Sequence, residues 1–439
     1  MKVVWVINIT MPEVCTALGR PMPVIGGWLV GYRDALLSHY PNVELHIVEP
    51  YWGAKERTLS LETPIHAAGG CSSNQTITHH LFPSSWLNSN QELSTSFQPR
   101  LSAASNRMVA HFCELNDSIQ PDVVHLHGTE FPHAFAWIEA NGTEHTIASI
   151  QGLAFEYAKV FMSGLSAKQQ RPSLSDCRHG FSLAKEQDML ARRGDAEVAL
   201  LQRIEHIAGR TTWDHDCTLA INGQLNYHVL QEVLRQEFYS AAGSWKIQEC
   251  QPHTLFVSQS HYPIKGLHKL LEALPAVIAR YPDTQVRIVG NDHSAKHWWQ
   301  RSTYGNVLHR LIQEHRLSGH LCFLGAQTAQ QMVDEYQKAN VFVCPSRIEN
   351  SCNSVCEAQL IGTPVVAACV GGMESLIEHK QTGMLYGFED TTALADSICQ
   401  LFASTDQSMK MSQAGILKAQ QRHDPEAIAH SLYNIYQHI

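Results

Sequence analysis

Short apolar runs alternate with helical patterns along the whole chain, and this alternation limits the fold more than any other feature. Four runs in the first half are VVWVINI from Val3, VELHIVE from Val43, DVVHLHG from Asp122 and TIASIQG from Thr146. Such runs are typical of strands buried in a sheet. Amphipathic segments such as GWLVGYRDALLSHY lie between them. The order of these elements predicts a parallel α/β domain.

The same alternation begins again after the segment GSWKIQEC, which ends at residue 250. Its strand-like runs are TLFVSQS from Thr254, QVRIVG from Gln285, HLCFLG from His320, VFVCPS from Val341 and PVVAACV from Pro364. We therefore predict an α/β fold with two Rossmann-like, doubly wound domains, at residues 1–245 and 246–422, facing each other across a cleft. A helix within 423–439 should cross back and close the structure. Ligands of such sheets bind outside the carboxyl ends of the strands, where the strand order reverses.

The composition excludes several classes of protein. The 439 residues carry 32 Lys and Arg against 41 Asp and Glu, a net charge of -9, and nucleic-acid binding needs a basic surface that this balance does not offer. The start, MKVVWVINITMPEV, is too short and too polar for a signal or membrane helix, so we expect a cytoplasmic protein. Its 12 cysteines should then be free thiols. Cys352 and Cys356 lack the second ligand pair of a zinc site.

The segment CPSRIENSCNSVCEAQLIG, from Cys344, places two carboxylates beside a helix start. Glu349 follows a strand-like run, and a helix capped by Asn353 or Ser354 would begin just after it. The first N–H groups of a helix attract phosphate, and carboxylate oxygens accept hydrogen bonds from vicinal hydroxyls. Glu349 is therefore a candidate for binding a sugar, and Glu357 for binding a ribose. The structural alternative is a capping box made by Ser354 and Glu357.

Lys265 and Gly266 lie between another strand-like run and a helix, in VSQSHYPIKGLHKLLEALP. A lysine at a helix N-terminus is unfavourable by about 0.3–1 kcal/mol unless an anion compensates its charge. A diphosphate would be such an anion. The alternative is an ordinary surface lysine.

Two strand ends in the first half carry further candidates. His125 and His127, in DVVHLHG, point to the same face of their strand because side chains alternate. A histidine can act as donor or base beside a reacting hydroxyl, and a hydrogen-bonded structural histidine is the alternative. Gly26 and Gly27 precede a helix, where glycines permit the close approach of a diphosphate or simply form a turn.

Asp214 and Asp216, in TTWDHDC, imitate an Asp-x-Asp metal motif. No strand leads directly into this segment, and the two-sheet organisation differs from the architecture that uses such a motif. We therefore predict no metal site.

The segment PSRIENSCNSVCEAQLIGTPVVAACVGGMESLIEHKQTGMLY resembles the C-terminal signature of retaining glycosyltransferases of family 4, the glycosyl transferases group 1, of the cell-surface polysaccharide type. That signature has two glutamates with seven residues between them after a strand ending in Pro-Ser, then Glu-Ala, Gly-x-Pro-Val-Val, a Gly-Gly pair followed closely by Glu, and Thr-Gly. The matching residues are Glu349, Glu357 with Ala358, Gly362 to Val366, Gly371 to Glu374, and Thr382 with Gly383. The resemblance implies the GT-B architecture.

By this resemblance, the catalytic residues are His127, Glu349 and Lys265. Glu349 contacts the transferred sugar, Lys265 the diphosphate and Glu357 the ribose, while Gly290 lies near the base. The donor-binding positions implied are Gly26, Gly27, Gln259, Lys265, Gly290, Asn350, Ser351, Asn353, Ser354 and Glu357.

The chain departs from the family pattern in two places. After Glu349 the family has Gly-Phe-Gly, where this chain has Asn-Ser-Cys at 350–352. The family's Gly-Arg pair is replaced by Ser-Gln, so that Gln259 stands where a phosphate-binding cation is usual. His261 and Arg347 are candidates for the missing cation.

The activity implied is sugar transfer from a nucleoside diphosphate sugar, with UDP or GDP as the nucleotide, to a hydroxyl, with retention and without metal or other cofactor. The acceptor would be a saccharide or lipid-linked saccharide of capsule or lipopolysaccharide synthesis, with peripheral contact to the inner face of the cell membrane. Two other interpretations stay open: a GT-B sugar-nucleotide 2-epimerase and a catalytically silent GT-B binding protein.

Overall fold

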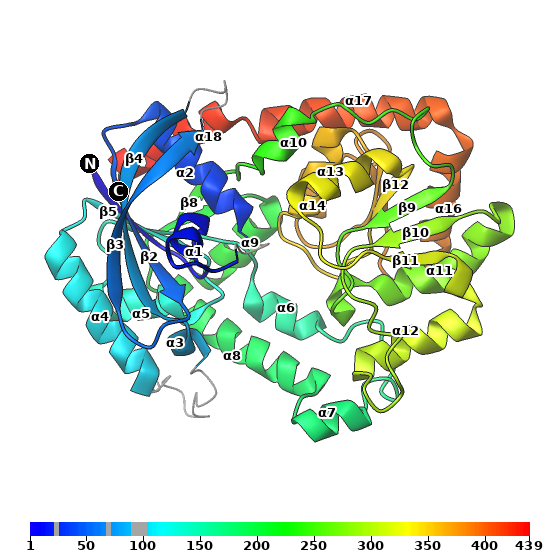
Figure 1. The fold of residues 1–439 in the computed structure, drawn as a ribbon, viewed down its shortest axis with the longest axis horizontal. Coiled ribbons are helices and arrows are strands. Elements are labelled where there is room, and N and C mark those ends of the chain that lie inside the picture. Colours follow the sequence, from blue (N-terminus) through cyan, green and yellow to red (C-terminus); the bar gives the residue numbers. More distant parts are fainter. Residues whose placement is uncertain (22–25, 67–71, 89–102) are drawn as a thin grey trace. The chain divides into compact units, whose positions relative to one another are not determined.

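The computed structural model describes residues 1–21, 26–66, 72–88 and 103–439. The chain forms two compact units, each containing one sheet (Figure 1). The first comprises Met1–Glu156, Met189–Val233 and His423–Ile439, and the second comprises Tyr157–Asp188 and Leu234–Arg422. The two units thus interleave in sequence, whereas the sequence predicts the continuous ranges 1–245 and 246–422. The interleaving was not predicted because hydrophobic patterning does not show which unit a connecting segment packs on.

The first unit holds an eight-stranded sheet of order β3-β4-β2-β1-β5-β6-β7-β8. Its strands are β1 (Lys2–Val6), β2 (Glu44–Tyr51), β3 (Arg57–His66), β4 (Ser72–Pro83), β5 (Val123–His127), β6 (Thr146–Ser149), β7 (His206–Gly209) and β8 (Asn226–Val229). Neighbouring strands are parallel except β3 and β4, which form an antiparallel pair. The four predicted runs correspond to β1, β2, β5 and β6.

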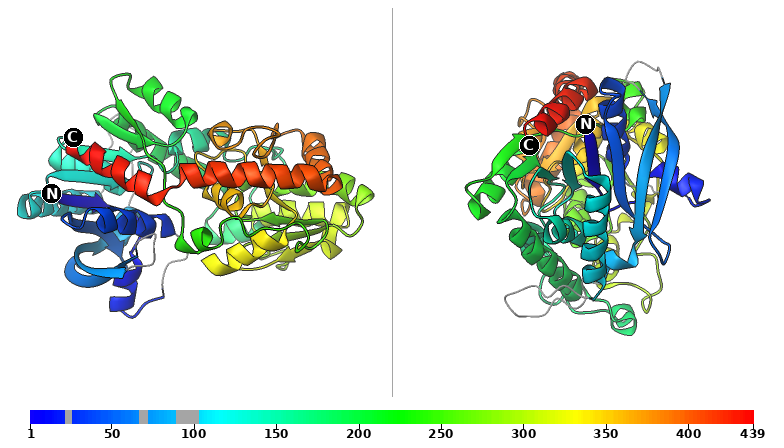
Figure 2. Two further views of the ribbon diagram at one scale, coloured as in Figure 1. Left: turned by 90° about the horizontal axis from the view of Figure 1, so that it is seen from above. Right: turned by 90° about the vertical axis from the view of Figure 1, so that its left-hand side faces the viewer.

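The helices of this unit are α1 (Pro12–Ala17), α2 (Gly27–His39), α3 (Ser85–Asn88), α4 (Ala103–Ile119), α5 (Pro132–Asn141), α9 (Thr212–Ile221) and α18 (Pro425–Gln437). The division of the chain falls within α6 (Ala154–Val160) and α8 (Leu183–Leu201), so each unit holds part of both helices. Helix α18, red in Figure 2, packs on α2. The Tyr436 hydroxyl of α18 accepts a hydrogen bond from Trp5 Nε1 at 3.0 Å and lies 2.6 Å from His125 Nδ1. These bonds attach the last helix to β1 and β5.

The second unit holds a six-stranded parallel sheet of order β11-β10-β9-β12-β13-β14. Its strands are β9 (Thr254–Val257), β10 (Gln285–Ile288), β11 (Leu321–Phe323), β12 (Val341–Cys344), β13 (Val365–Ala368) and β14 (Met384–Tyr386). Strands β9, β12 and β13 are buried along their whole length. Phe256, Phe342 and Tyr336 pack against one another in the core, with ring centroids 4.9–5.8 Å apart.

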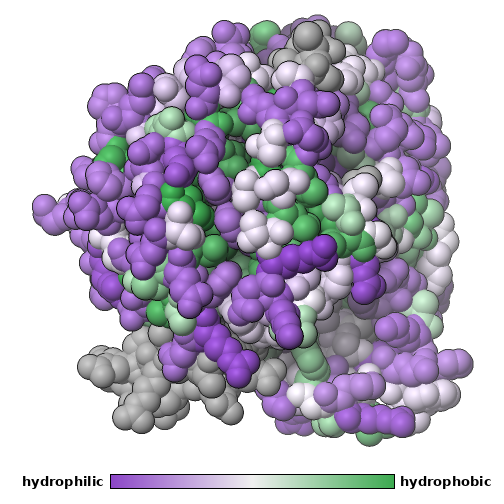
Figure 3. Space-filling view, turned by 60° about the vertical axis from the view of Figure 1, so that its left-hand side comes forward, coloured by the Kyte–Doolittle hydropathy of each residue, from purple (hydrophilic) through white to green (hydrophobic). Residues whose placement is uncertain are grey.

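The helices of the second unit are α7 (Leu174–His179), α10 (Gln236–Ser240), α11 (Leu267–Arg280), α12 (Thr303–Glu314), α13 (Ala329–Lys338), α14 (Asn353–Ile361), α15 (Met373–Leu376), α16 (Thr391–Ala403) and α17 (Thr405–Arg422), with the short 3-10 helices η2 (Pro263–Lys265) and η3 (Leu317–Gly319). Among the described residues, no helix has the length and apolar character needed to cross a membrane. The face seen in Figure 3 is mainly hydrophilic, with smaller apolar patches.

Candidate active site

The strand order of the second sheet reverses between β9 and β12. The chain adds β10 and β11 on one side of β9, and β13 and β14 on the far side of β12. Loops after β9 and β12 therefore leave the same point at the carboxyl edge, which is where α/β sheets bind ligands. Lys265 follows β9 and Glu349 follows β12. Although 84 positions separate them, Lys265 Nζ lies 2.7 Å from Glu349 Oε1.

The Lys265–Glu349 ion pair is largely shielded from water. Only 18% of the Lys265 side chain and 11% of the Glu349 side chain are exposed. Burial lowers the pKa of Lys265, but the Glu349 carboxylate outweighs burial, so that the pKa stands above its ordinary value. The Ser346 hydroxyl donates to the same carboxylate oxygen at 2.7 Å. Lys265 is thus not an ordinary surface lysine, which was the alternative interpretation. The anion that compensates its charge within the protein is Glu349.

Two glycines hold this pair in place. Gly266 has a φ of +70°, and a Cβ there would lie 1.7 Å from the carbonyl oxygen of Pro345. Gly371 has a φ of +53°, and its Cβ would lie 2.1 Å from the Glu349 carbonyl oxygen. L-residues with a side chain rarely adopt such angles, and a clash with backbone cannot be relieved by rotating a side chain. Gly266 and Gly371 are therefore packing requirements of this edge.

Helix α14 begins without a side-chain cap. Its N-cap residue is Cys352, whose side chain forms no capping hydrogen bond, and Asn353 and Ser354 lie within the helix. The prediction that Asn353 or Ser354 caps the helix is therefore wrong, and so is the capping-box alternative. Ser351 Oγ is buried and has no hydrogen-bond partner among the described residues. The neighbouring Asn350 is also buried, and its N–H donates to the Tyr157 hydroxyl at 3.1 Å.

Glu357 lies one turn into α14 and is bound by groups from distant parts of the chain. Arg235 Nη2 donates to Glu357 Oε1 at 2.7 Å, and the Tyr336 hydroxyl lies 3.3 Å from Oε2. Burial raises the pKa of Glu357, and Arg235 opposes that rise. Arg235 directly precedes α10, in a stretch where no site residue is predicted. Nothing local in the sequence marks it, because its contact with Glu357 spans 122 positions.

Two thiols lie beside this site. Cys344 and Cys352 are free and buried, with their Sγ atoms 3.8 Å apart. Together with Glu349 they place three potential metal-ligand atoms within 4.8 Å of one another. The Lys265 ammonium binds the same carboxylate.

The remaining donor-side candidates lie around β9 and β10. Gln259 is exposed just after β9, and Gly290 follows β10 with its α-carbon facing the ring of His261. The N–H of Arg347 donates to Ile264 O at 2.7 Å, next to Lys265, and its guanidinium lies over an aromatic ring. Of the two candidates for the missing cation, Arg347 is therefore the one beside the Lys265 turn.

The first sheet reverses its strand order between β1 and β5, and His127 ends β5. Its ring stacks on His125 at 3.9 Å and contacts Trp28 of α2 at 5.6 Å. Neither ring nitrogen of His127 has a hydrogen-bond partner among the described residues. Burial, with smaller effects from neighbouring histidines, holds its pKa well below the ordinary value. Gly26 and Gly27 begin α2, and residues 22–25 before them lie outside the described residues.

His125 is instead a hydrogen-bonded structural histidine, which was the alternative interpretation of this strand. Its Nδ1 faces the Tyr436 hydroxyl and its Nε2 lies 2.5 Å from Ser149 Oγ. Because the Tyr436 hydroxyl accepts from Trp5, it is free to donate to Nδ1, which requires neutral His125. Of the two histidines in this strand, only His127 is left with nitrogens to offer a ligand.

A buried carboxyl pair lies at the same edge and was not predicted. Thr129 Oγ1 donates to Glu197 Oε1 at 2.5 Å, and Glu130 Oε2 has no hydrogen-bond partner among the described residues. Burial raises the pKa of Glu130 to about 7 and that of Glu197 to about 8. Glu130 follows the His-x-His strand by three residues, so its position in the sequence could have identified it.

The Asp-x-Asp pattern has a structural role. Asp214 is buried and forms a capping box with Thr211 at the start of α9. It also accepts from the N–H of Arg210 at 3.0 Å. Asp216, by contrast, is exposed. These contacts agree with discounting the segment as a metal motif.

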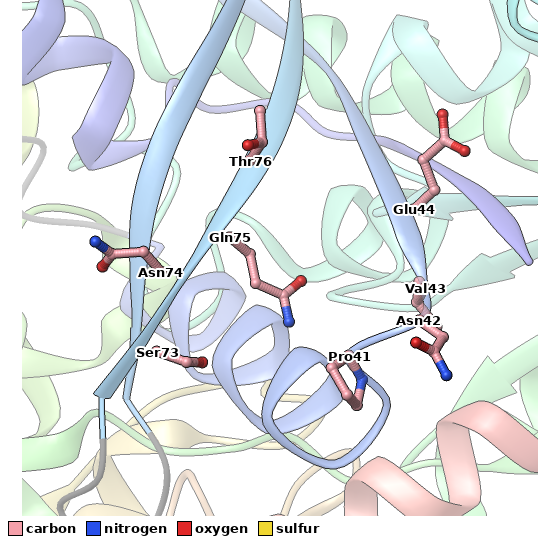
Figure 4. A pocket seen from close by; sticks show the side chains of 8 residues that line it. All are labelled: Pro41, Asn42, Val43, Glu44, Ser73, Asn74, Gln75 and Thr76. Carbon is pink, nitrogen blue, oxygen red and sulfur yellow. The ribbon is translucent and has the colours of Figure 1, made fainter.

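An open groove lies at the opposite edge of the first sheet. It has a volume of about 520 Å³ and lies at the amino ends of β2 and β4 (Figure 4). Its lining residues are Pro41, Asn42, Val43, Glu44, Ser73, Asn74, Gln75 and Thr76. None of the predicted site residues lines it, and ligands of parallel sheets bind at the other edge.

Comparison with known proteins bears on the fold and on the second unit. Residues 242–418 match the family model described as Glycosyl transferases group 1. Over the whole chain, the structure resembles HepE from Anabaena in complex with UDP and glucose, with a TM-score of 0.61 and 16% identity, covering 100% of both chains. It also resembles sucrose-phosphate synthase from Thermosynechococcus elongatus, with a TM-score of 0.65 and 15% identity, covering 100% of this chain and 98% of that one.

The chain has the GT-B fold. The fold class predicted from the sequence, two Rossmann-like parallel α/β sheets, is thereby confirmed. Among curated relatives, D-inositol 3-phosphate glycosyltransferase of Corynebacterium urealyticum is 33% identical over 150 residues, which are 34% of this chain and 35% of the relative. The chain thus matches about a third of the length of this relative.

Proposed function

We propose that the protein is a glycosyltransferase that moves a sugar from a nucleoside diphosphate sugar to a hydroxyl acceptor, with retention. The observation that carries this proposal is the buried Lys265–Glu349 pair at the reversal point of the second sheet, beside the uncapped start of α14. The match of residues 242–418 to the glycosyl transferases group 1 model supports it. UDP and glucose bound to HepE support a nucleotide-sugar donor.

In this proposal the donor exchanges with the internal ion pair. The diphosphate takes the ammonium of Lys265 and the N-terminal amides of α14, whose partial positive charge suits phosphate. Glu349, released from Lys265, accepts hydrogen bonds from the hydroxyls of the transferred sugar. Stabilisation of the departing diphosphate by the ammonium and the amides then lowers the barrier. No metal ion is needed for that step.

The other predicted residues complete the proposal. Glu357, held in position by Arg235 and Tyr336, accepts from the ribose hydroxyls. In the first unit, His127 offers its free nitrogens and Glu130 its unpaired oxygen to the acceptor hydroxyl. A saccharide or lipid-linked saccharide of the cell surface is the acceptor class that we propose.

The test is release of free nucleotide from a panel of UDP-, GDP- and ADP-sugars, with and without added acceptor. We expect one donor to react and Glu349→Ala to slow the reaction about 10²-fold. Glu389→Ala is the matched control, because Glu389 pairs with Lys269 of the adjacent helix at the same 2.7 Å. Release that survives Glu349→Ala, or no release with any donor, would contradict the proposal. Conversion of the donor to an isomer without nucleotide release would indicate the epimerase.

A further inference from the structure

Two adjacent tryptophans of the second unit lie on the surface. Trp298 and Trp299 are 63% and 43% exposed. They sit on a turn between β10 and α12, in which the Gln300 N–H donates to His297 O at 2.8 Å. His297 stacks on Trp299, with ring centroids 4.7 Å apart. Large apolar rings presented on a tight turn are costly to leave in water unless something covers them.

Helix α7 and the residues just after it present a second exposed apolar group. Leu174 and Phe181 are 56% and 55% exposed, whereas Ser175 and Asp176 are buried. Leu174 and Arg178 are four residues apart and therefore share the outer face of the helix. The exposed side of α7 thus combines apolar and cationic side chains.

Hydrogen bonds hold the two segments next to each other. The Thr303 N–H, at the start of α12, donates to Asp176 Oδ2 at 2.7 Å. The Ser173 N–H donates to Thr303 Oγ1 at 2.9 Å, and that hydroxyl lies 3.2 Å from Arg171 O. All four residues belong to the second unit, and Figure 1 shows α7 below the start of α12. We call residues 168–181 and 292–303 together the tryptophan surface.

The charge of the tryptophan surface is opposite to that of the chain. Its cations are Lys168, Arg171, Arg178, Lys296 and Arg301, and none of them forms an ion pair with the described residues. Its two carboxylates are engaged internally: Asp176 with Thr303, and Asp292 with the N–H and hydroxyl of Ser294 at 2.8 and 2.6 Å. The whole chain carries 32 cations against 41 acids, so this excess is local.

We propose that the tryptophan surface docks on an anionic lipid bilayer. Indole rings favour the headgroup region, and lysine and arginine are attracted to anionic headgroups. Cations without ion pairs lie here beside exposed aromatic and aliphatic side chains. This combination matches a bilayer, which has anionic headgroups over an apolar interior, better than it matches a neutral saccharide. This docking does not depend on the sugar transfer proposed above, and its failure would leave that proposal standing.

The test is co-sedimentation of the full chain with phosphatidylcholine vesicles that contain or lack phosphatidylglycerol. We expect binding only to the phosphatidylglycerol vesicles, lost on raising the salt concentration. The double variant Trp298→Ser, Trp299→Ser should weaken binding about tenfold or more, and Lys296→Gln with Arg301→Gln should do the same. The matched control is Trp52→Ser, which removes a 40% exposed tryptophan of the first unit and should bind like the wild type.

Near-ultraviolet circular dichroism establishes that each variant is folded. Equal binding by wild type and the double tryptophan variant, or equal binding to both vesicle types, would overturn the proposal. So would a wild type that binds no vesicle but self-associates through these tryptophans in gel filtration, because a protein would then cover the surface.

Discussion

The Arg235–Glu357 pair gives a direct test of how the ribose-side carboxylate is held. Arg235→Gln leaves a buried carboxyl group without its cation. We expect the free energy of unfolding to fall by about 2 kcal/mol. This is less than the roughly 3–5 kcal/mol lost when one partner of a fully buried ion pair is removed, because 22% of the Arg235 side chain is exposed. Urea denaturation measures it. Arg280→Gln, which breaks an exposed pair with Asp396, should change nothing measurable, and equal losses in both variants would contradict the assignment.

The buried, neutral state of His125 predicts a pH dependence. Burial lowers its pKa to about 3, whereas in the unfolded chain it is about 6.5. The contribution of His125 to stability is therefore complete above the unfolded value and is lost as the pH falls, because only the unfolded chain takes up the proton. From about pH 7.5 to about pH 5.5 the loss is about 1.4 kcal/mol.

The variant His125→Gln cannot take up that proton. Over the same pH range the wild type should thus lose about 1.4 kcal/mol more than the variant, measured by urea denaturation at each pH. A parallel pH dependence of the two proteins would show that His125 is not buried in its neutral form.

Among single residues, the sequence identified those that follow strands. It missed those that contact the site from distant positions in the chain. Lys265 and Glu349 both follow apolar runs, and the structure brings them to 2.7 Å. Arg235 and Tyr336 reach Glu357 from positions whose contacts no local pattern encodes. Catalytic and binding roles for these residues stay predictions until a donor is tested.

The start of α14 sets a prediction at the scale of one element. Because Ser354 does not cap the helix, Ser354→Ala should lower the free energy of unfolding by less than about 0.5 kcal/mol. Thr328→Ala should cost about 1 kcal/mol, since Thr328 forms a capping box with Gln331 at the start of α13. Thermal or urea unfolding of the two variants compares them. A larger loss for Ser354→Ala would mean that it caps the helix after all.

The strands that were predicted differ physically from those that were not. Strands β9, β12 and β13 are continuous apolar runs because both faces of the sheet are covered. The β3 strand alternates exposed residues with partly or fully buried ones, and β8 is nowhere fully buried. Edge strands of this kind need few apolar residues, so their sequences, such as RTLSLETPIH, give no comparable signal.

For the whole molecule, both sheets repeat one arrangement. In each, the strand order reverses once between parallel neighbours, β1 and β5 or β9 and β12. His127 and Gly26 lie beside the first reversal, and Lys265 and Glu349 beside the second. The alternation of apolar runs predicted this duplication. The interleaving of the two units along the chain was not predicted, because contacts between residues far apart in sequence decide it. The buried hydrogen bond between Thr303 and Asp176, for example, ties the segment that contains α7 to the second unit.

The most direct measurement is calorimetric titration of UDP and GDP into wild type, Lys265→Met and Lys269→Met. Lys269 is the matched control, since it lies four residues after Lys265, is buried and pairs with Glu389 and Glu272. We expect one nucleotide to bind the wild type and the Lys269 variant with equal affinity, and Lys265→Met to bind it about tenfold or more weakly, as loss of a charge-assisted contact implies. Undiminished affinity in Lys265→Met, or equal weakening in both variants, would contradict a diphosphate site at the reversal point of the second sheet.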